Sequence, residues 1–470
     1  MIAVGGLVAI VVLDQAPNAL GAVTATGAFA VAVLLAVAPV GRRTMQEWGP
    51  LAGRFLGRHA SGRTHFRSPA PRQGFWVARG DHGRRRHLGP PAKPPPSLRG
   101  VVITEAPYQD HSIGVISECR GKRMTAVMAC RVVSFTLLDP EAQERRLARW
   151  GLVLSGAAGT AVRRIQWIER TVPAQGDELA RWVGAERDPS IPLRGTPLID
   201  SYLELIDTTA RVTQEHEILL AVQVDASRVR DRGSQGVARA LVEQTERVAQ
   251  GLEAAEVNVL GALSPGQLAR ALRTAFDPYA GAELAVLETA DADRDGLSRS
   301  GAWPVGCRES WEQYQADGAL HTTYWIGAWP RVEVSPMFMD ALLGRSSAVR
   351  TVAVSFEPIP IERSTRDVEA AVTRDRADRD LRHRFGQSDT ARQRQAEEAT
   401  VRREAELAAG HGEVRFAGFI TITGRDGDDL RRACAEVHEH AARARLELHR
   451  MYGQQADAFT FTLPLCRGLR

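Results

Sequence analysis

An acidic stretch of the sequence has the opening pattern of a calcium-binding loop. Asp291, Asp293 and Asp295 alternate and Gly296 follows them, as in the D-x-D-x-D-G start of an EF-hand loop. A complete loop needs a bidentate glutamate at its twelfth position, and that position holds Ala302. We therefore interpret the stretch as a polar surface turn and predict no metal site there.

Two histidines, His438 and His440, lie close together in a segment with a helical pattern. Residues two apart on a helix point about 200° away from each other, so this pair cannot hold one ion as an H-E-x-x-H pair does. We interpret both as residues of a solvated helix face.

Motifs for nucleotide binding and nucleophilic catalysis are missing from the sequence. It has no G-x-x-x-x-G-K-[ST] loop, no strand-linked G-x-G-x-x-G and no G-x-S-x-G elbow. The five cysteines are scattered without a C-x-x-C pair, as expected of reduced thiols. We predict no catalytic, cofactor-binding or metal-binding residue, with a membrane-bound enzyme whose site is assembled from distant residues as an alternative.

Positive charge is concentrated near the N-terminus. Between residues 41 and 100 there are thirteen Arg and Lys but only two acids, whereas the remainder of the chain is mildly acidic. A nucleic-acid-binding domain carries its basic patch on the folded part, so no sequence-specific nucleic-acid binding is predicted. A basic block beside apolar segments is typical of the cytoplasmic side of a membrane, where it attracts anionic lipids.

Two apolar segments precede the basic block. Residues 19–40 form an uncharged run of 22, about the length that spans a bilayer, and residues 1–13 form a shorter one. We expect a transmembrane helical hairpin at 1–40, with Arg42 and Arg43 orienting it so that the body faces the cytoplasm. A cleaved signal peptide is the rival, but no basic start or small-x-small cleavage site supports it.

Composition divides the rest of the chain into three regions. Residues 41–99 read as a basic juxtamembrane segment ending in a proline-rich linker, 100–345 as an α+β cytoplasmic domain, and 346–470 as a C-terminal α+β unit with a charged helical insertion at 362–409. The predicted fold class is thus an α+β body with ferredoxin-like β-α-β units on a two-helix transmembrane anchor, carrying a charged helical hairpin. No internal sequence repeat is evident.

Several elements of the body can be assigned from periodicity and capping. Alternating apolar residues predict a strand over 217–224, and the spacing of Val237, Leu241, Val248 and Leu252 predicts an amphipathic helix. Asp139-Pro140 and Ser264-Pro265 each have the pattern of an N-cap followed by proline at the first helical position.

Aromatic residues gather between residues 303 and 329. The cluster contains Trp303, Trp311, Trp325 and Trp329 with two tyrosines among them. Core packing is the default interpretation because such side chains bury large areas, and a partner surface is the alternative.

The order of these features resembles a family of actinobacterial integral membrane proteins encoded beside conjugation-type (type IV secretion) motor ATPases. Three segments carry the resemblance: 263–278 with Ser264, Asp277 and Pro278; 311–325 with Trp325; and 450–465 with Tyr452, Gly453, Gln455, Phe459 and Pro464. All of these are packing or turn residues.

The resemblance implies a body similar to the non-motor N-terminal domain of those ATPases. It implies a non-enzymatic inner-membrane scaffold, part of an oligomeric assembly, that docks a separate motor ATPase. The first alternative is a type VII secretion component resembling EccE. Neighbouring genes discriminate the two, since a conjugation-type ATPase would accompany the first and an FtsK-type ATPase with small secreted substrates the second.

Overall fold

The computed structural model describes chiefly residues 43–69, 92–109, 111–131, 138–173, 214–280, 299–332, 334–344, 346–368 and 412–469, with a few shorter pieces outside these ranges. Arg42, most of 1–40, the acidic stretch 291–296 and most of the predicted insertion 362–409 lie outside the described residues. Of Arg43 only its place in the short strand β2 (Arg43–Thr44), paired with β1 (Pro39–Val40), is described.

The predicted fold class was wrong in its membrane anchor. Most of the described residues belong to one large antiparallel sheet with its covering helices, and no described helix is both long and apolar enough to cross a membrane. The helix that precedes the sheet, α3 (Met45–Ala60), carries Arg, Gln, Glu and His side chains along its length.

The first half of the body is one supersecondary unit. A meander of three strands leads into a β-α-β-β-α-β sequence, in which strand β11 pairs with β8, β8 with β10, and β10 with β9. This spatial order, 4-1-3-2, is that of a ferredoxin-like unit. Its elements are β6 (Val102–Tyr108), β7 (His111–Glu118), β8 (Arg123–Arg131), α4 (Pro140–Gly156), β9 (Val162–Pro173), β10 (Gln214–Asp225), α7 (Ser234–Ala254), β11 (Asn258–Ala262) and α8 (Pro265–Phe276).

The second half repeats this topology element by element. Strand β17 pairs with β14, β14 with β16, and β16 with β15, again after a three-strand meander. The topology is therefore duplicated, although no internal repeat is evident in the sequence. The elements are β12 (Gly306–Glu309), β13 (Tyr314–Ala316), β14 (Ala319–Ala328), α10 (Asp340–Leu343), β15 (Val349–Ile359), β16 (Glu413–Gly424), α13 (Gly427–Arg443), β17 (Glu447–Arg450) and α14 (Gln455–Phe459).

Strands β9 and β15 join the two units into a single sheet. They pair antiparallel from Arg350 opposite Thr171 to Phe356 opposite Ile165. With β3 (His65–Arg67) added at one edge, the described sheet has 13 strands. The small ribbon of β4 (Val77–Arg79) and β5 (Arg85–His87) is separate.

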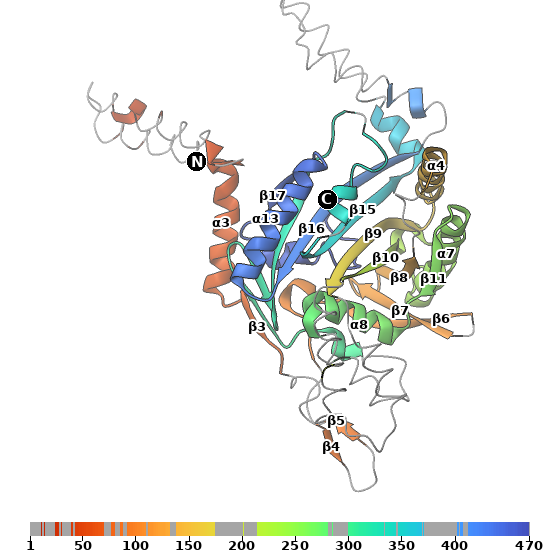
Figure 1. The fold of residues 1–470 in the computed structure, drawn as a ribbon, viewed down its shortest axis with the longest axis horizontal. Coiled ribbons are helices and arrows are strands. Elements are labelled where there is room, and N and C mark those ends of the chain that lie inside the picture. Colours follow the sequence, from red (N-terminus) through yellow and green to blue (C-terminus); the bar gives the residue numbers. More distant parts are fainter. Residues whose placement is uncertain are drawn as a thin grey trace, which may run out of the picture.

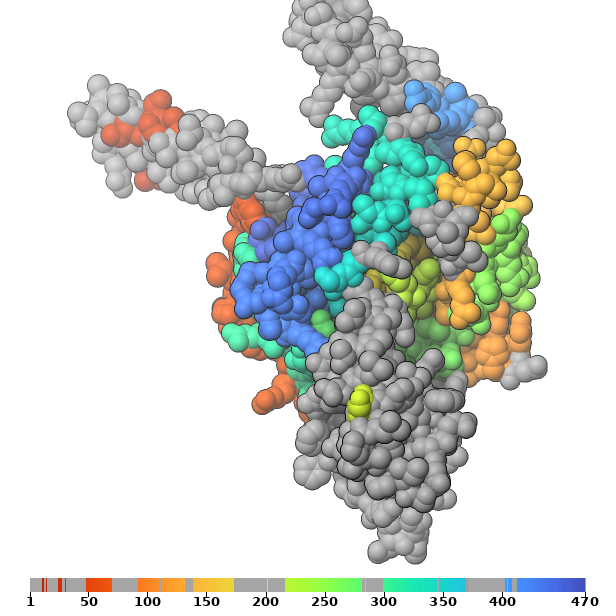
Figure 2. All heavy atoms as spheres, viewed as in Figure 1, coloured from red at the N-terminus to blue at the C-terminus, as the bar shows by residue number. Residues whose placement is uncertain are grey.

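Helices cover both faces of this sheet (Figure 1). On one face α4 and α7 pack over the first unit and α13 over the second, with Trp167 of β9 touching both apolar clusters. In the space-filling view the blue C-terminal unit lies beside α3, and α4 and α7 cover the opposite end (Figure 2). The other face holds α8 and the segment that follows β17, whose Phe276 and Phe459 rings are 5.1 Å apart.

The sequence patterns of several elements are confirmed. The strand over 217–224 is part of β10, and the four apolar residues assigned to one helical stripe are all buried on α7. Asp139 caps α4 by accepting a hydrogen bond from the Ala142 amide, and Ser264 forms a capping box with Gln267 at the start of α8. These caps satisfy amide groups that a helix leaves unpaired at its N-terminus.

The C-terminal segment crosses from the second unit onto the first. The carboxamide of Gln166 on β9 donates to the Phe461 carbonyl and accepts from the Cys466 amide, and Gln223 on β10 donates to the Leu465 carbonyl. Arg467 forms an ion pair with buried Glu118 of β7. Polar groups at the centre of the sheet are thus satisfied by backbone from the last ten residues.

His321 ties three elements together in the interior. It lies on β14, and its Nε2 donates to the Phe276 carbonyl of α8 at 2.9 Å. Its Nδ1 therefore accepts from the Thr423 hydroxyl of β16, also at 2.9 Å. Complete burial lowers the pKa of His321 to about 4, against the opposing effect of the Phe276 hydrogen bond, so the ring is neutral at pH 7.

This histidine predicts a pH dependence of stability. The pKa of His321 is lower in the folded chain than in the unfolded one, so between pH 6.5 and about 4 the unfolded state binds more protons. The free energy of unfolding therefore decreases as the pH is lowered through this range. The loss across that window is roughly 3 kcal/mol. Urea unfolding at a series of pH values measures it, and His321→Gln should remove this share of the slope. His111→Gln, at an exposed position of β7, serves as the control; equal slopes in all three proteins would contradict the assignment.

Candidate functional site

The N-terminal arm, which we define as α3 together with β3, docks on the edge of the second unit. Strand β3 pairs antiparallel with β12, and the α3 rings of Trp48 and Phe55 contact Trp311, with centroids 5.9 and 5.2 Å apart. Trp48 also contacts Tyr452 edge-on at 5.4 Å. Aromatic contacts of this kind add to the stabilisation from burial alone, so the arm is held by packing as well as by strand pairing.

Arg58 fixes the arm to the body by charge. Its guanidinium lies 3.3 Å from carboxylates of both Glu309 and Asp457 and donates to the Gly453 carbonyl. The Glu309 side chain is almost fully buried and accepts a further hydrogen bond from the Ala456 amide. Burial raises the pKa of Glu309, and the Ala456 amide and Arg58 oppose that rise. A buried carboxylate with one cationic partner makes Arg58 costly to remove.

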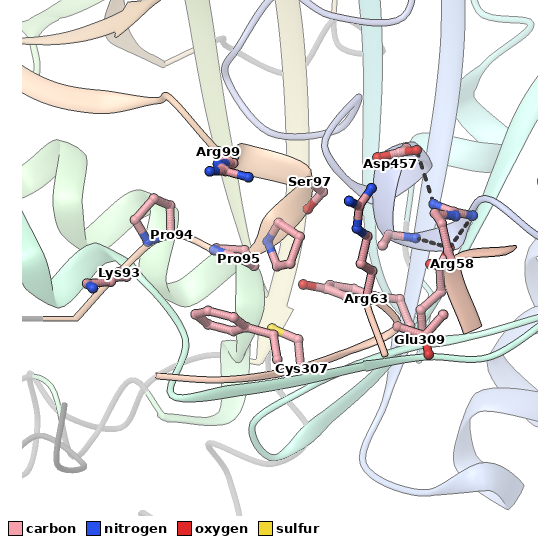
Figure 3. A pocket seen from close by; sticks show the side chains of 15 residues that line it. Arg58, Arg63, Lys93, Pro94, Pro95, Ser97, Arg99, Cys307, Glu309 and Asp457 are labelled. Carbon is pink, nitrogen blue, oxygen red and sulfur yellow. Dashed lines mark hydrogen bonds and ion pairs between the residues drawn. The ribbon is translucent and has the colours of Figure 1, made fainter. Parts of the chain in front are cut away.

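A groove of about 610 Å³ opens where the arm, the proline-rich segment and the body meet. Four basic and two acidic side chains line it, together with apolar ones, and the residues come from segments far apart in the sequence (Figure 3). The lining consists of Arg58, Arg63, Thr64, Phe66, Lys93, Pro94, Pro95, Pro96, Ser97, Arg99, Cys307, Glu309, Tyr314, Ala456 and Asp457.

The charges in this groove are unevenly satisfied. Arg58 is paired with both acids, whereas Arg63, Lys93 and Arg99 are exposed and have no side-chain partner among the described residues. In Figure 3 Arg63 lies between Ser97 and Arg58, and Lys93 and Arg99 lie on the other side of Ser97. The groove therefore has an excess of available positive charge.

The body side of the groove contains two buried groups that could do chemistry only when ionised. Burial raises the pKa of the Cys307 thiol to about 12, so it is a neutral thiol at pH 7. Tyr314 is almost fully buried, and burial together with the neighbouring Cys307 thiol raises the pKa of its hydroxyl. These groups provide a neutral, largely apolar floor.

Metal binding has no candidate in the described part of the chain, where no three His, Cys, Asp or Glu side chains are grouped around one point. The acidic stretch 291–296 lies outside the described residues. His438 donates from its Nδ1 to the Cys434 carbonyl of its own helix and packs on the Tyr324 ring. It is not directed toward His440.

The residues that carried the family resemblance lie at equivalent ends of the two units. Ser264 caps α8, and Asp277 at the end of α8 is buried and accepts from the Gly318 and Tyr279 amides, with Pro278 buried in the following turn. In the second unit, Gln455 is fully buried and bonds both backbone groups of Thr323 on β14.

The remaining signature residues pack around the arm and the interior. Phe459 contacts the His321 ring at 4.7 Å, and Pro464 is buried in the C-terminal segment. Tyr452 and Gly453 receive the arm, whereas Trp325 is 38% exposed on β14 beside His449. Of the aromatic cluster, buried Trp303 belongs to the core, and Trp311 forms the contact with α3.

Sequence reasoning missed the groove. We interpreted the proline-rich segment as a spacer, yet Pro94–Pro96 form one wall. Arg58 and Arg63 were counted only as part of the basic block. The amphipathic pattern of 45–60 was a usable signal for docking, but the ion pair of Arg58 joins residues 251 and 399 positions apart, which no local pattern reveals.

Gly453 offers a test of how the arm is held. Its φ is +66°, and a Cβ there would lie 2.5 Å from the Trp311 ring. Gly453→Ala should therefore destabilise the chain by about 2–3 kcal/mol and expose the arm to protease, because Trp311 must move. Gly62→Ala is the matched control, since its φ is +69° with no atom within 4 Å, and should cost about 1 kcal/mol. Equal losses in urea unfolding would show that Trp311 packing contributes nothing.

Comparison with known families gives one partial match. Residues 212–326 match the family described as "Putative type VII ESX secretion system translocon, EccE". This range is less than half of the chain and runs from β10 to β14, including Cys307, Glu309 and Tyr314 of the groove. A search of curated proteins gives no match. The match supports a secretion-system component and gives no support to the conjugation-type family that the sequence layout resembles.

Proposed function

We propose that this chain is a non-enzymatic component of a type VII-like secretion apparatus, in which it docks other subunits, including the motor ATPase. The observation that carries this proposal is the match of residues 212–326 to the EccE translocon family. The conjugation-type assignment has no comparable support. The type VII alternative, which the sequence left open, is therefore the better one.

The matched region coincides with the part of the fold suited to docking. Strands β12 and β13 form the edge on which the arm lies, and both fall within 212–326. Addition of a strand to an exposed sheet edge is a common way for proteins to bind further chains, and β3 pairs with β12 in this manner. The contact of arm and body is thus a model for how this sheet engages partners.

The chemistry of the interior supports a binding role. Burial raises the pKa of Cys130 to about 11, that of Cys307 to about 12, and that of Cys466 still further. Neutral buried thiols are poor nucleophiles, and His321 is neutral with both ring nitrogens engaged. The described groove therefore favours binding over covalent catalysis.

Location follows from the proposed assembly. A translocon acts at a membrane, so we expect this chain at the cytoplasmic membrane as part of that complex. All five cysteines are free, and four of them are buried. Unpaired thiols are typical of a reducing compartment, which supports a body facing the cytoplasm.

Affinity purification tests the proposal. The tagged full-length chain is expressed in its native host, crosslinked, solubilised in mild detergent and purified, and the associated proteins are identified by mass spectrometry. We expect type VII components, including an FtsK-type ATPase, to co-purify, because a docking subunit remains with its partners. An untagged strain and an unrelated tagged membrane complex are the controls.

Two outcomes would contradict the proposal. Recovery of a conjugation-type ATPase would favour the alternative machine, and recovery of the chain alone after crosslinking would exclude a stable secretion assembly. The flanking genes provide an independent check, since an FtsK-type ATPase with small secreted substrates is expected beside this gene.

A further inference from the structure

We infer that the groove between the N-terminal arm and the body binds an acidic peptide segment of a partner protein. The inference goes beyond the type VII assignment and does not depend on it. It rests on the geometry and charge of the groove defined above.

The groove carries an excess of positive charge. The groove holds three exposed basic side chains, Arg63, Lys93 and Arg99, without side-chain partners among the described residues. Arg58 pairs with both Glu309 and Asp457, and the four cations and two carboxylates of the lining together leave a net positive charge. Carboxylates entering a partly enclosed groove interact with such cations more strongly than in open solvent. An anionic ligand is therefore favoured.

Part of the groove lining is apolar. Phe66, Pro94 and Pro95 contribute apolar surface to the lining. A simple anion such as phosphate would leave the apolar surface unused. The volume, about 610 Å³, lies in the range that accommodates a ligand of several linked groups. The occupant must combine negative charge with an apolar body.

The proline-rich wall of the groove is rigid. The wall formed by Pro94–Pro96 runs into the turn η1 (Pro96–Leu98), where Leu98 is fully buried in the core. The Leu98 amide donates to the Pro95 carbonyl at 2.9 Å, and the Val101 amide to the Leu98 carbonyl at 3.0 Å. Prolines restrict the backbone before binding, so little ordering cost remains for this wall when a ligand enters.

A peptide fits these features better than nucleic acid or lipid. Three available cations are too few for a duplex-binding surface, which carries an extended basic patch. A lipid site that faces a bilayer would be rimmed by exposed apolar side chains. None of the described exposed large apolar residues lines the groove. An extended acidic peptide matches both the positive charge and the apolar part of the lining.

The chain offers matched variants for a test. Arg63→Glu with Arg99→Glu reverses two charges of the groove. Arg67→Glu with Arg308→Glu reverses two exposed charges on the adjoining strands β3 and β12, at positions that do not line it. Side chains alternate between faces along a strand, so Arg67 and Arg308 lie on the face opposite Phe66 and Cys307. Thermal melts confirm that both variants fold.

Fluorescence anisotropy with the full-length chain measures binding of a labelled peptide of alternating glutamate and alanine, with a glutamine-for-glutamate peptide as comparison. We expect the glutamate peptide to bind, the glutamine peptide and the groove variant to show affinity weaker by at least about tenfold, and the control variant to bind like the wild type. Added salt should weaken binding.

Three results would overturn the inference. Equal loss in the two variants would show a general surface effect. Failure of the glutamate peptide to bind would exclude a peptide site, and binding of phosphatidylglycerol vesicles in its place, lost in the groove variant, would assign the groove to lipid. Each of these outcomes is independent of the affinity purification, which reports on assembly with secretion subunits and can succeed or fail separately.

Discussion

The pairing of β9 with β15 is the constraint on which the rest of the structure depends. Each unit ends on one of these strands, and an unpaired strand of this length would expose a row of amide and carbonyl groups. Their antiparallel contact removes both edges and buries Gln166 and Ser355 at the centre, where the C-terminal backbone accepts their hydrogen bonds. Because that backbone belongs to the second unit and crosses the first, the two halves cannot separate without leaving buried polar groups unsatisfied.

The two units share one topology, so a feature present in only one of them identifies a specialised part of the molecule. Both units present the outer edge of a three-strand meander, β6 in one and β12 in the other. Only β12 is covered by a described segment of the arm, through β3, the aromatic contacts and Arg58. The groove exists because the arm and the proline-rich segment come together at this one end. The candidate site thus lies where the two units differ, and its residues come from outside the repeated elements as well as from them.

Helix caps and apolar periodicity depend on neighbouring residues, so individual elements could be predicted from the sequence. Contacts between distant segments leave no local pattern, so the sheet order and the groove could not. The capping box of Ser264 and the stripe of α7 follow from spacing alone, and both are present. The anchor expected at 1–40 is not supported, since no described helix is both long and apolar enough to cross a membrane. The groove was missed because Arg58, Pro95 and Glu309 contribute to one surface from three distant segments. The domain boundaries proposed from composition stay a prediction, although β15 pairs across one of them with β9.

The extent of the family match has a structural consequence. Residues 212–326 contain β10 and most of β14 but none of β8, β9, β16 or β17, with which these strands pair. Alone, this stretch would leave both β10 and β14 with open edges and the apolar faces of α7 and α8 only partly covered. In this chain the missing strands come from both sides of the stretch, β8 and β9 before it and β16 and β17 after it. The matched stretch therefore spans the junction of the two units, and strands from both sides complete its pairing.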